Sequence, residues 1–104
     1  MSEAQLKPAD GAGLFRLSGD LSFDTVPGLW AQAERLFRDA DRVELDLGAV
    51  GRTDSAGLAL LVALARRARQ RGRSIRYTHF PEQLLAMARL SGLAGLLELD
   101  VDPA

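Results

Sequence analysis

One stretch constrains the fold more than any other: residues 42–50 have the pattern of a strand, and a short loop leads from them into an unbroken apolar run at residues 57–65. In the first segment apolar and acidic side chains alternate, which is the period of a strand with one buried face. The apolar run is far shorter than the roughly 20 residues that cross a bilayer. It therefore predicts a buried helix, from Ser55 to about Arg71, that follows closely on the strand.

The rest of the chain repeats this alternation of strand and helix. Strands are predicted at residues 13–22 and 72–80, and helices at about 25–39 and from Pro81 to Gly92. A last short strand is predicted at 96–101, with an extra edge strand from residues 3 to 8. Because alternating strands and helices need crossover connections, the expected fold is one α/β domain. It spans residues 1–104, has its core at about 13–100, and contains a mainly parallel sheet of four to five strands covered by helices.

Composition narrows the classes of function. The chain has 104 residues, no cysteine, one histidine and a formal net charge of −1. The absence of cysteine excludes disulfides and thiolate metal sites. A net charge near zero gives no overall attraction to nucleic acid or to an anionic membrane. The N-terminal residues lack the apolar core of a signal peptide, so we expect a cytoplasmic protein that does not insert into a membrane.

Candidate catalytic groups are few. The single histidine, His79, rules out metal motifs built on two histidines, and a catalytic triad would need distant partners. No glycine-rich phosphate-binding loop occurs. We therefore expect a protein that is not an enzyme and that binds no cofactor or metal. His79 itself is interpreted as a partly exposed residue between a strand and a helix.

Six arginines gather at the end of the central helix and in the strand after it: Arg66, Arg67, Arg69, Arg71, Arg73 and Arg76. Basic side chains near a helix C-terminus complement the helix dipole, and this is the simplest explanation of the cluster. Contact with an acidic protein surface or with lipid headgroups is the alternative. Aromatic residues are not interleaved with the arginines except for Tyr77, so nucleic-acid binding is not expected.

Ser55 stands at the predicted start of the helix, and three interpretations of it remain open. In the first, Ser55 or the preceding Asp54 caps the helix by accepting a bond from a backbone N–H. In the second, Ser55 carries a regulatory phosphate, which a helix N-terminus tolerates and which adds about two negative charges to the surface. In the third, this helix start is a docking surface for another protein.

The apolar run is wider than a helix packed only on its own sheet requires. Leu58 and Leu61 lie on one face of the predicted helix, whereas Leu60 and Leu64 lie about a third of a turn away. Either a neighbouring helix or a partner protein covers this surplus, and the sequence favours neither. Gly57, in the first turn, allows another backbone to approach closely.

Together, "RVELDLGAV" and "TDSAGLALLVAL" resemble the STAS domain, the fold of anti-sigma factor antagonists and related bacterial regulators. The signature of that family is a hydrophobic strand followed by D-[ST]-x-G at a helix start, and the order of elements is similar from about residue 14 to residue 99. The resemblance implies a non-catalytic domain that acts by binding proteins. It implicates the helix start in partner binding or regulation: Asp54, Ser55, Ala56 and Gly57, with Leu58 and Leu61 as further candidates that also suit a core.

A narrower resemblance, carried by "LSGDLSFDTVPGLW" and "MARLSGLAGLLEL", is to the STAS subunit of the phospholipid ABC transporters that maintain outer-membrane lipid asymmetry. It implies a cytoplasmic subunit, peripheral at the inner membrane, that binds the ATPase subunit and through it a permease. The alternative is an anti-sigma factor antagonist that leaves its partner when a kinase phosphorylates Ser55. Ala56 departs from the antagonist pattern, in which a second Ser or Thr is common at this position.

Overall fold

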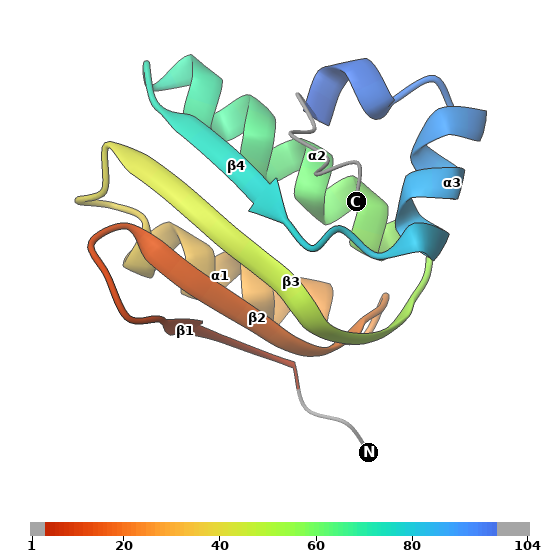
Figure 1. Cartoon of the computed structure of the whole chain (residues 1–104), viewed down its shortest axis with the longest axis horizontal. Coiled ribbons are helices and arrows are strands. Elements are labelled where there is room, and N and C mark those ends of the chain that lie inside the picture. Colours follow the sequence, from red (N-terminus) through yellow and green to blue (C-terminus); the bar gives the residue numbers. More distant parts are fainter. Residues whose placement is uncertain (1–3, 98–104) are drawn as a thin grey trace.

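The computed structural model describes residues 4–97, in which four strands form one sheet and three α-helices follow the strands in alternation (Figure 1). This order confirms the predicted α/β fold. The elements are β1 (Gln5–Pro8), β2 (Leu14–Leu21), α1 (Val26–Leu36), β3 (Arg42–Thr53), α2 (Ser55–Gln70), β4 (Ser74–Thr78), α3 (Glu82–Leu90) and a 3₁₀ helix, η1 (Ala94–Leu97).

The sheet has the strand order β1-β2-β3-β4 and is mainly parallel, as predicted. β1 is the expected edge strand and pairs antiparallel with β2, whereas β2 with β3 and β3 with β4 are parallel pairs. Leu14 pairs with Glu44 and Leu21 with Thr53, so β3 uses two more residues than β2 over the same stretch. Two bulges of this kind bend and twist a strand. With these two extra residues, β3 ends at Thr53, three residues after its predicted end at residue 50, and Thr53 pairs with Leu21 at the end of β2.

The prediction of a final strand at residues 96–101 is wrong for its first two residues, which belong to η1; residues 98–101 lie outside the described residues. α3 ends at Leu90, and the φ of +70° at Gly92, two residues later, turns the chain so that the N–H of Leu93 donates to the carbonyl oxygen of Ala88 at 2.8 Å. The short helical turn that follows packs on α2 and buries Leu97. The prediction failed because a run of two apolar residues has the same pattern in a helical turn as in a buried strand.

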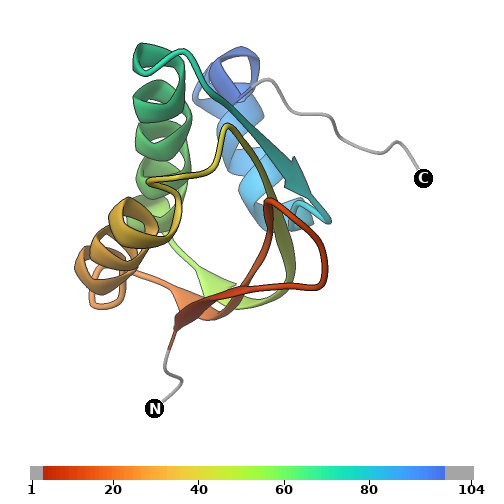
Figure 2. The same ribbon diagram turned by 90° about the vertical axis from the view of Figure 1, so that its left-hand side faces the viewer.

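The helices cover one face of the sheet only (Figure 2). Inward side chains such as Leu17, Leu45 and Tyr77 are buried, while the positions between them carry charged residues such as Arg16 and Asp46. The alternation in the sequence encodes this difference, because successive side chains of a strand point to opposite faces. Most parallel sheets are covered on both faces, so the charged outer face is an unusual feature of this fold.

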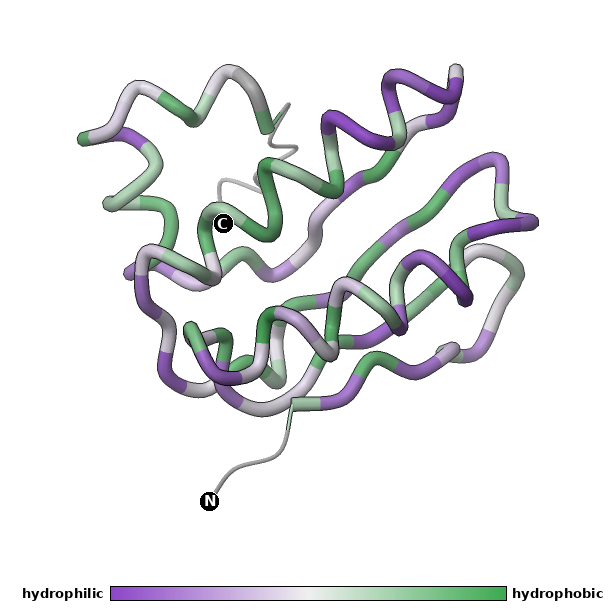
Figure 3. Tube along the Cα trace, turned by 180° about the vertical axis from the view of Figure 1, so that it is seen from behind, coloured by the Kyte–Doolittle hydropathy of each residue, from purple (hydrophilic) through white to green (hydrophobic). Residues whose placement is uncertain are grey.

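α2 is the central helix, and its wide apolar belt is covered from within the molecule. α1, α3, η1 and β4 all contact it. The belt residues are buried: Leu58, Leu60, Leu61, Val62 and Leu64. Figure 3 shows the hydrophobic N-terminal half of this helix and its hydrophilic C-terminal end. The open question from the sequence is therefore answered: neighbouring elements of the same chain cover the surplus.

A buried hydrogen bond joins α2 to the sheet. The hydroxyl of Tyr77, on β4, donates to the backbone carbonyl oxygen of Leu61 at 2.6 Å. Burial raises the pKa of Tyr77 well above its ordinary value, since the charged phenolate has no water around it. The bond fixes the position of α2 over the sheet, and with it the position of the helix start.

Candidate functional site

The candidate site lies where β2 and β3 end and where α1 and α2 begin. In parallel α/β sheets, loops at the carboxyl ends of the strands are the usual place for binding sites. The backbone N–H of Asp54 donates to the carbonyl oxygen of Leu21 at 3.1 Å, which holds the two strand ends together. The loop at residues 22–25 and the start of α2 consequently form one continuous surface.

Asp54 is the helix cap and also connects the two loops. Its Oδ1 accepts hydrogen bonds from the N–H groups of Ala56, at 2.8 Å, and Gly57, at 3.3 Å. Its Oδ2 accepts a bond from the N–H of Phe23 at 3.2 Å. Of the two residues considered for capping, Asp54 takes this role because its extended backbone and two carboxylate oxygens reach both sets of donors.

Ser55 is the first residue of α2 and is exposed. Since Asp54 caps the helix, the Ser55 hydroxyl is not needed for that purpose. It lies at the positive end of the helix dipole, a position that favours an acceptor or an anion. Docking and phosphorylation remain as the two interpretations of this residue.

Gly57 explains how the two halves of the site come so close. A Cβ atom at this position would lie 2.7 Å from Cβ of Leu21 and 2.9 Å from its carbonyl oxygen. Real Cβ atoms do not make contacts this short, so any larger residue would force α2 away from β2. The close neighbour predicted from the sequence is therefore the end of β2.

Leu58 and Leu61 do not belong to the accessible surface. Leu58 is 4% exposed and Leu61 is fully buried. Of the two alternatives that the sequence left open for them, their burial fits the core, because a partner does not reach side chains that the core covers. Asp54 and Ser55 are exposed, Ala56 is half-buried, and Gly57 is buried against β2.

Phe23 is a further candidate that the sequence did not indicate. Its side chain is 79% exposed, although burial of a phenylalanine is normally favourable. The loop around it is held by Thr25, whose Oγ1 accepts a bond from the N–H of Ser22 at 2.9 Å and donates to the carbonyl oxygen of Asp20 at 2.7 Å. Phe23 is thus presented to solvent by an ordered loop. The only sequence feature that could have indicated Phe23 is the occurrence of an aromatic residue among residues that favour turns.

His79 belongs to a different place, at the end of β4. Its Nδ1 lies 3.0 Å from Oδ1 of Asp46, its side chain is 72% exposed, and its φ is +53°. Burial of Asp46 acts most strongly and raises the pKa of that carboxyl group. The N–H of Gly48, His79 and the guanidinium of Arg16 together outweigh it, so that the pKa of Asp46 is lowered. His79 is therefore a surface residue whose imidazole is paired with the carboxylate of Asp46.

Two further properties concern residues 4–97. No helix there is both long and apolar enough to cross a membrane. The acidic side chains and His79 of this range form no group of three that could hold a metal ion.

Comparison with known proteins identifies the family to which this sequence belongs. A family described as "Mlab, STAS domain" matches residues 4–98, which include the whole candidate site. No curated protein matches the sequence significantly.

Similar folds occur in several solved structures. An anti-sigma factor antagonist from Mycobacterium paratuberculosis is 20% identical, with a TM-score of 0.76, over 100% of this chain and 87% of that one. A putative anti-sigma factor antagonist from Thermotoga maritima is 16% identical, with a TM-score of 0.75, over 95% and 86% of the two chains. A chain from the complex of the diguanylate cyclase SiaD with its activator SiaC, from Pseudomonas aeruginosa, is 18% identical, with a TM-score of 0.58, over 96% and 91%.

The fold and the capped helix start define a small α/β domain of the STAS class. The chain belongs to the MlaB-type STAS domain family.

Proposed function

We propose that this protein is a non-catalytic STAS subunit that binds the ATPase subunit of a phospholipid-transporting ABC complex. The observation that carries the proposal is the MlaB-type family match over residues 4–98. In this proposal the protein is cytoplasmic, lies at the inner membrane through its partner, and supports the activity of the ATPase beneath its permease. It contributes a binding surface and no reacting group.

The proposed contact is the surface formed by Phe23, Asp24, Asp54, Ser55 and Ala56, called here the Phe23–Ser55 surface. An exposed aromatic side chain on such a surface suits an apolar pocket on a partner, since burying a phenylalanine contributes about 2 kcal/mol. Asp54 orders both loops around it. The Ser55 hydroxyl, at the start of α2, supplies a polar contact beside this anchor.

The first experiment is a purification of the tagged protein from its own bacterial host in mild detergent, with partners identified by mass spectrometry. We expect an ABC ATPase with its permease in stoichiometric amounts. The affinity of the purified ATPase is then measured for Phe23→Ser and for a matched control, Leu90→Ser. Leu90 is 89% exposed on α3, so both variants remove one exposed apolar side chain.

We expect Phe23→Ser to weaken binding about tenfold or more, as loss of an interface anchor does, and Leu90→Ser to leave the affinity unchanged. Equal affinities for the two variants would show that the Phe23–Ser55 surface is not the contact. Recovery of no ABC ATPase from the host would overturn the proposed function itself.

An anti-sigma factor antagonist is the second candidate function, favoured by the exposure of Ser55 at the helix start. A phosphate on Ser55 would add about two negative charges beside the carboxylate of Asp54, which is sufficient to repel an acidic partner surface. The same purification separates the candidates. Recovery of a serine kinase in place of an ATPase, together with phosphate on Ser55 and loss of kinase binding in Ser55→Asp, would establish the antagonist function.

A further inference from the structure

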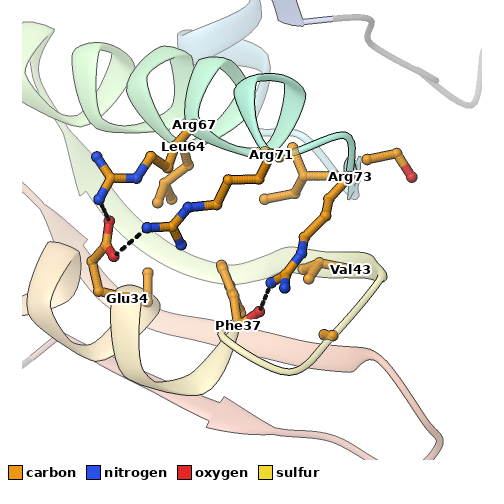
Figure 4. A pocket seen from close by; sticks show the side chains of 12 residues that line it. Glu34, Phe37, Val43, Leu64, Arg67, Arg71 and Arg73 are labelled. Atoms are coloured by element: carbon orange, nitrogen blue, oxygen red, sulfur yellow. Dashed lines mark hydrogen bonds and ion pairs between the residues drawn. The ribbon is translucent and has the colours of Figure 1, made fainter.

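The other end of α2 contains a small apolar cavity with a basic rim (Figure 4). It lies between the C-terminal parts of α1 and α2 and the first residues of β3 and β4, it is open to solvent on one side, and its volume is about 40 Å³. Its apolar walls include Ala33, Phe37, Val43, Leu64 and Ile75. Ser55 and Arg67 are both on α2 and about 18 Å apart along its axis, so this cavity is separate from the Phe23–Ser55 surface.

The rim carries an excess of positive charge. Among the lining residues there are three arginines and one acid, Glu34. Glu34 is shared: its Oε1 lies 3.1 Å from Nη2 of Arg67, and its Oε2 lies 3.6 Å from Nη2 of Arg71. Arg73 donates to the carbonyl oxygen of Phe37 at 3.0 Å, at the end of α1. The carboxylate of Glu34 therefore balances the guanidiniums of Arg67 and Arg71, and the guanidinium of Arg73 is hydrogen-bonded to the backbone.

Two of the arginines retain donors for a ligand. The side chains of Arg67 and Arg71 are 44% and 43% exposed, and each guanidinium has five N–H donors. Arg67 is also held in place by Trp30, because its guanidinium carbon lies 5.9 Å from the centre of the indole ring. The rim thus offers partly ordered cationic groups that suit carboxylates, which arginine binds with two parallel hydrogen bonds.

The size of the cavity decides which anionic ligand fits. A volume of about 40 Å³ exceeds what one water needs, yet it is far below the roughly 150 Å³ of an engineered cavity that binds benzene. It therefore accommodates the end of one aliphatic side chain but not the full length of an acyl chain. We propose that this cavity is a docking site for an acidic peptide segment of a partner protein, which inserts one aliphatic side chain between carboxylates that pair with Arg67 and Arg71.

The direct test is an NMR titration of the isotope-labelled full chain with a nonapeptide that has a central leucine between glutamates. We expect shifts of the backbone amides of Ala33, Leu64 and Ile75, and none at Phe23 or Ser55. Two control peptides replace the leucine with serine or the glutamates with lysines. Both should bind at least about tenfold more weakly, because each lacks one half of the proposed recognition.

Three protein variants complete the test. Arg71→Gln should weaken peptide binding about tenfold, the effect of losing one charged hydrogen-bonding group. Arg89→Gln is the matched control, an exposed arginine on α3 outside the cavity, and should bind as the wild type does. Ala68→Leu fills the cavity from its wall and should weaken binding at least as much as Arg71→Gln does. Unchanged thermal unfolding confirms that each variant is folded.

Several results would overturn the proposal. Equal binding of the leucine and serine peptides, or equal loss in Arg71→Gln and Arg89→Gln, would show attraction by charge alone. The absence of any shift at the cavity at millimolar peptide would show that there is no site. Binding to phosphatidylglycerol vesicles that Arg71→Gln abolishes, without a peptide response, would make the rim a lipid contact. None of these outcomes depends on which protein binds the Phe23–Ser55 surface.

Discussion

Asp54 and Ser55 are adjacent in the chain, but their side chains have different environments. The Asp54 carboxylate accepts three backbone hydrogen bonds, whereas Ser55 is exposed and outside the cap. We expect Asp54→Ala to lower the free energy of unfolding by about 1 to 2 kcal/mol, and Ser55→Ala to change it by less than about 0.5 kcal/mol. Urea denaturation measures both. A cost for Ser55→Ala as large as that for Asp54→Ala would contradict this division of roles.

Tyr77 makes the stability of the protein sensitive to alkaline pH. Its pKa is raised in the folded state, so the folded protein holds this proton while the unfolded chain releases it near pH 10.0. The stabilisation is fully present below that pH and is lost progressively as the pH rises above it. Since Tyr77 is the single tyrosine, we expect tyrosinate absorbance to appear together with the loss of helical circular dichroism. Tyrosinate absorbance from a fully folded protein would contradict this expectation.

The residue-level details of the site were only partly predictable. The motif at residues 54–57 indicated a helix start with a cap, but which of two neighbouring oxygens would accept the bonds depends on backbone angles that the motif leaves open. Phe23 was missed because an apolar residue in a loop is as compatible with burial as with exposure. Leu58 and Leu61 fitted both a core and an interface until their neighbours were known.

At the scale of elements, the approach of α2 to β2 depends on Gly57. Replacement by alanine improves helix propensity, yet its Cβ would collide with Leu21. We expect Gly57→Ala to destabilise the protein by about 1 to 3 kcal/mol, as overpacking does. Gly28→Ala is the matched control in α1, where a Cβ meets nothing within 4 Å, and it should stabilise by about 0.5 to 1 kcal/mol. Thermal unfolding of both variants distinguishes the two effects, and a stabilised Gly57→Ala would refute the close contact.

The order of the elements was predictable because their periods are distinct. Alternation marked β2, β3 and β4, and the spacing of apolar residues marked the three helices. The prediction of a strand at residues 96–97 was wrong because two adjacent leucines are too few to show the spacing of either a strand or a helix. The two bulges in β3 also had no signal, since they depend on the pairing of strands that are far apart in sequence.

For the whole molecule, the structure separates two proposed binding surfaces by most of the length of α2. Sites this far apart, with no shared residue, are expected to act independently. We predict that saturating acidic peptide changes the affinity of the ATPase for the protein by less than about twofold. A competition experiment with both purified ligands measures this. Mutual exclusion would mean that one partner covers both ends of the helix.

The contact between Arg67 and Trp30 has a practical consequence. Trp30 is the single tryptophan, so the fluorescence of the protein at tryptophan wavelengths comes from one ring, with the Arg67 guanidinium carbon 5.9 Å from its centre. A carboxylate that pairs with Arg67 at the rim of the cavity neutralises the positive charge beside that ring. The emission spectrum of the unlabelled protein would then change as the ligand binds, so that the molecule contains its own optical reporter of the cavity.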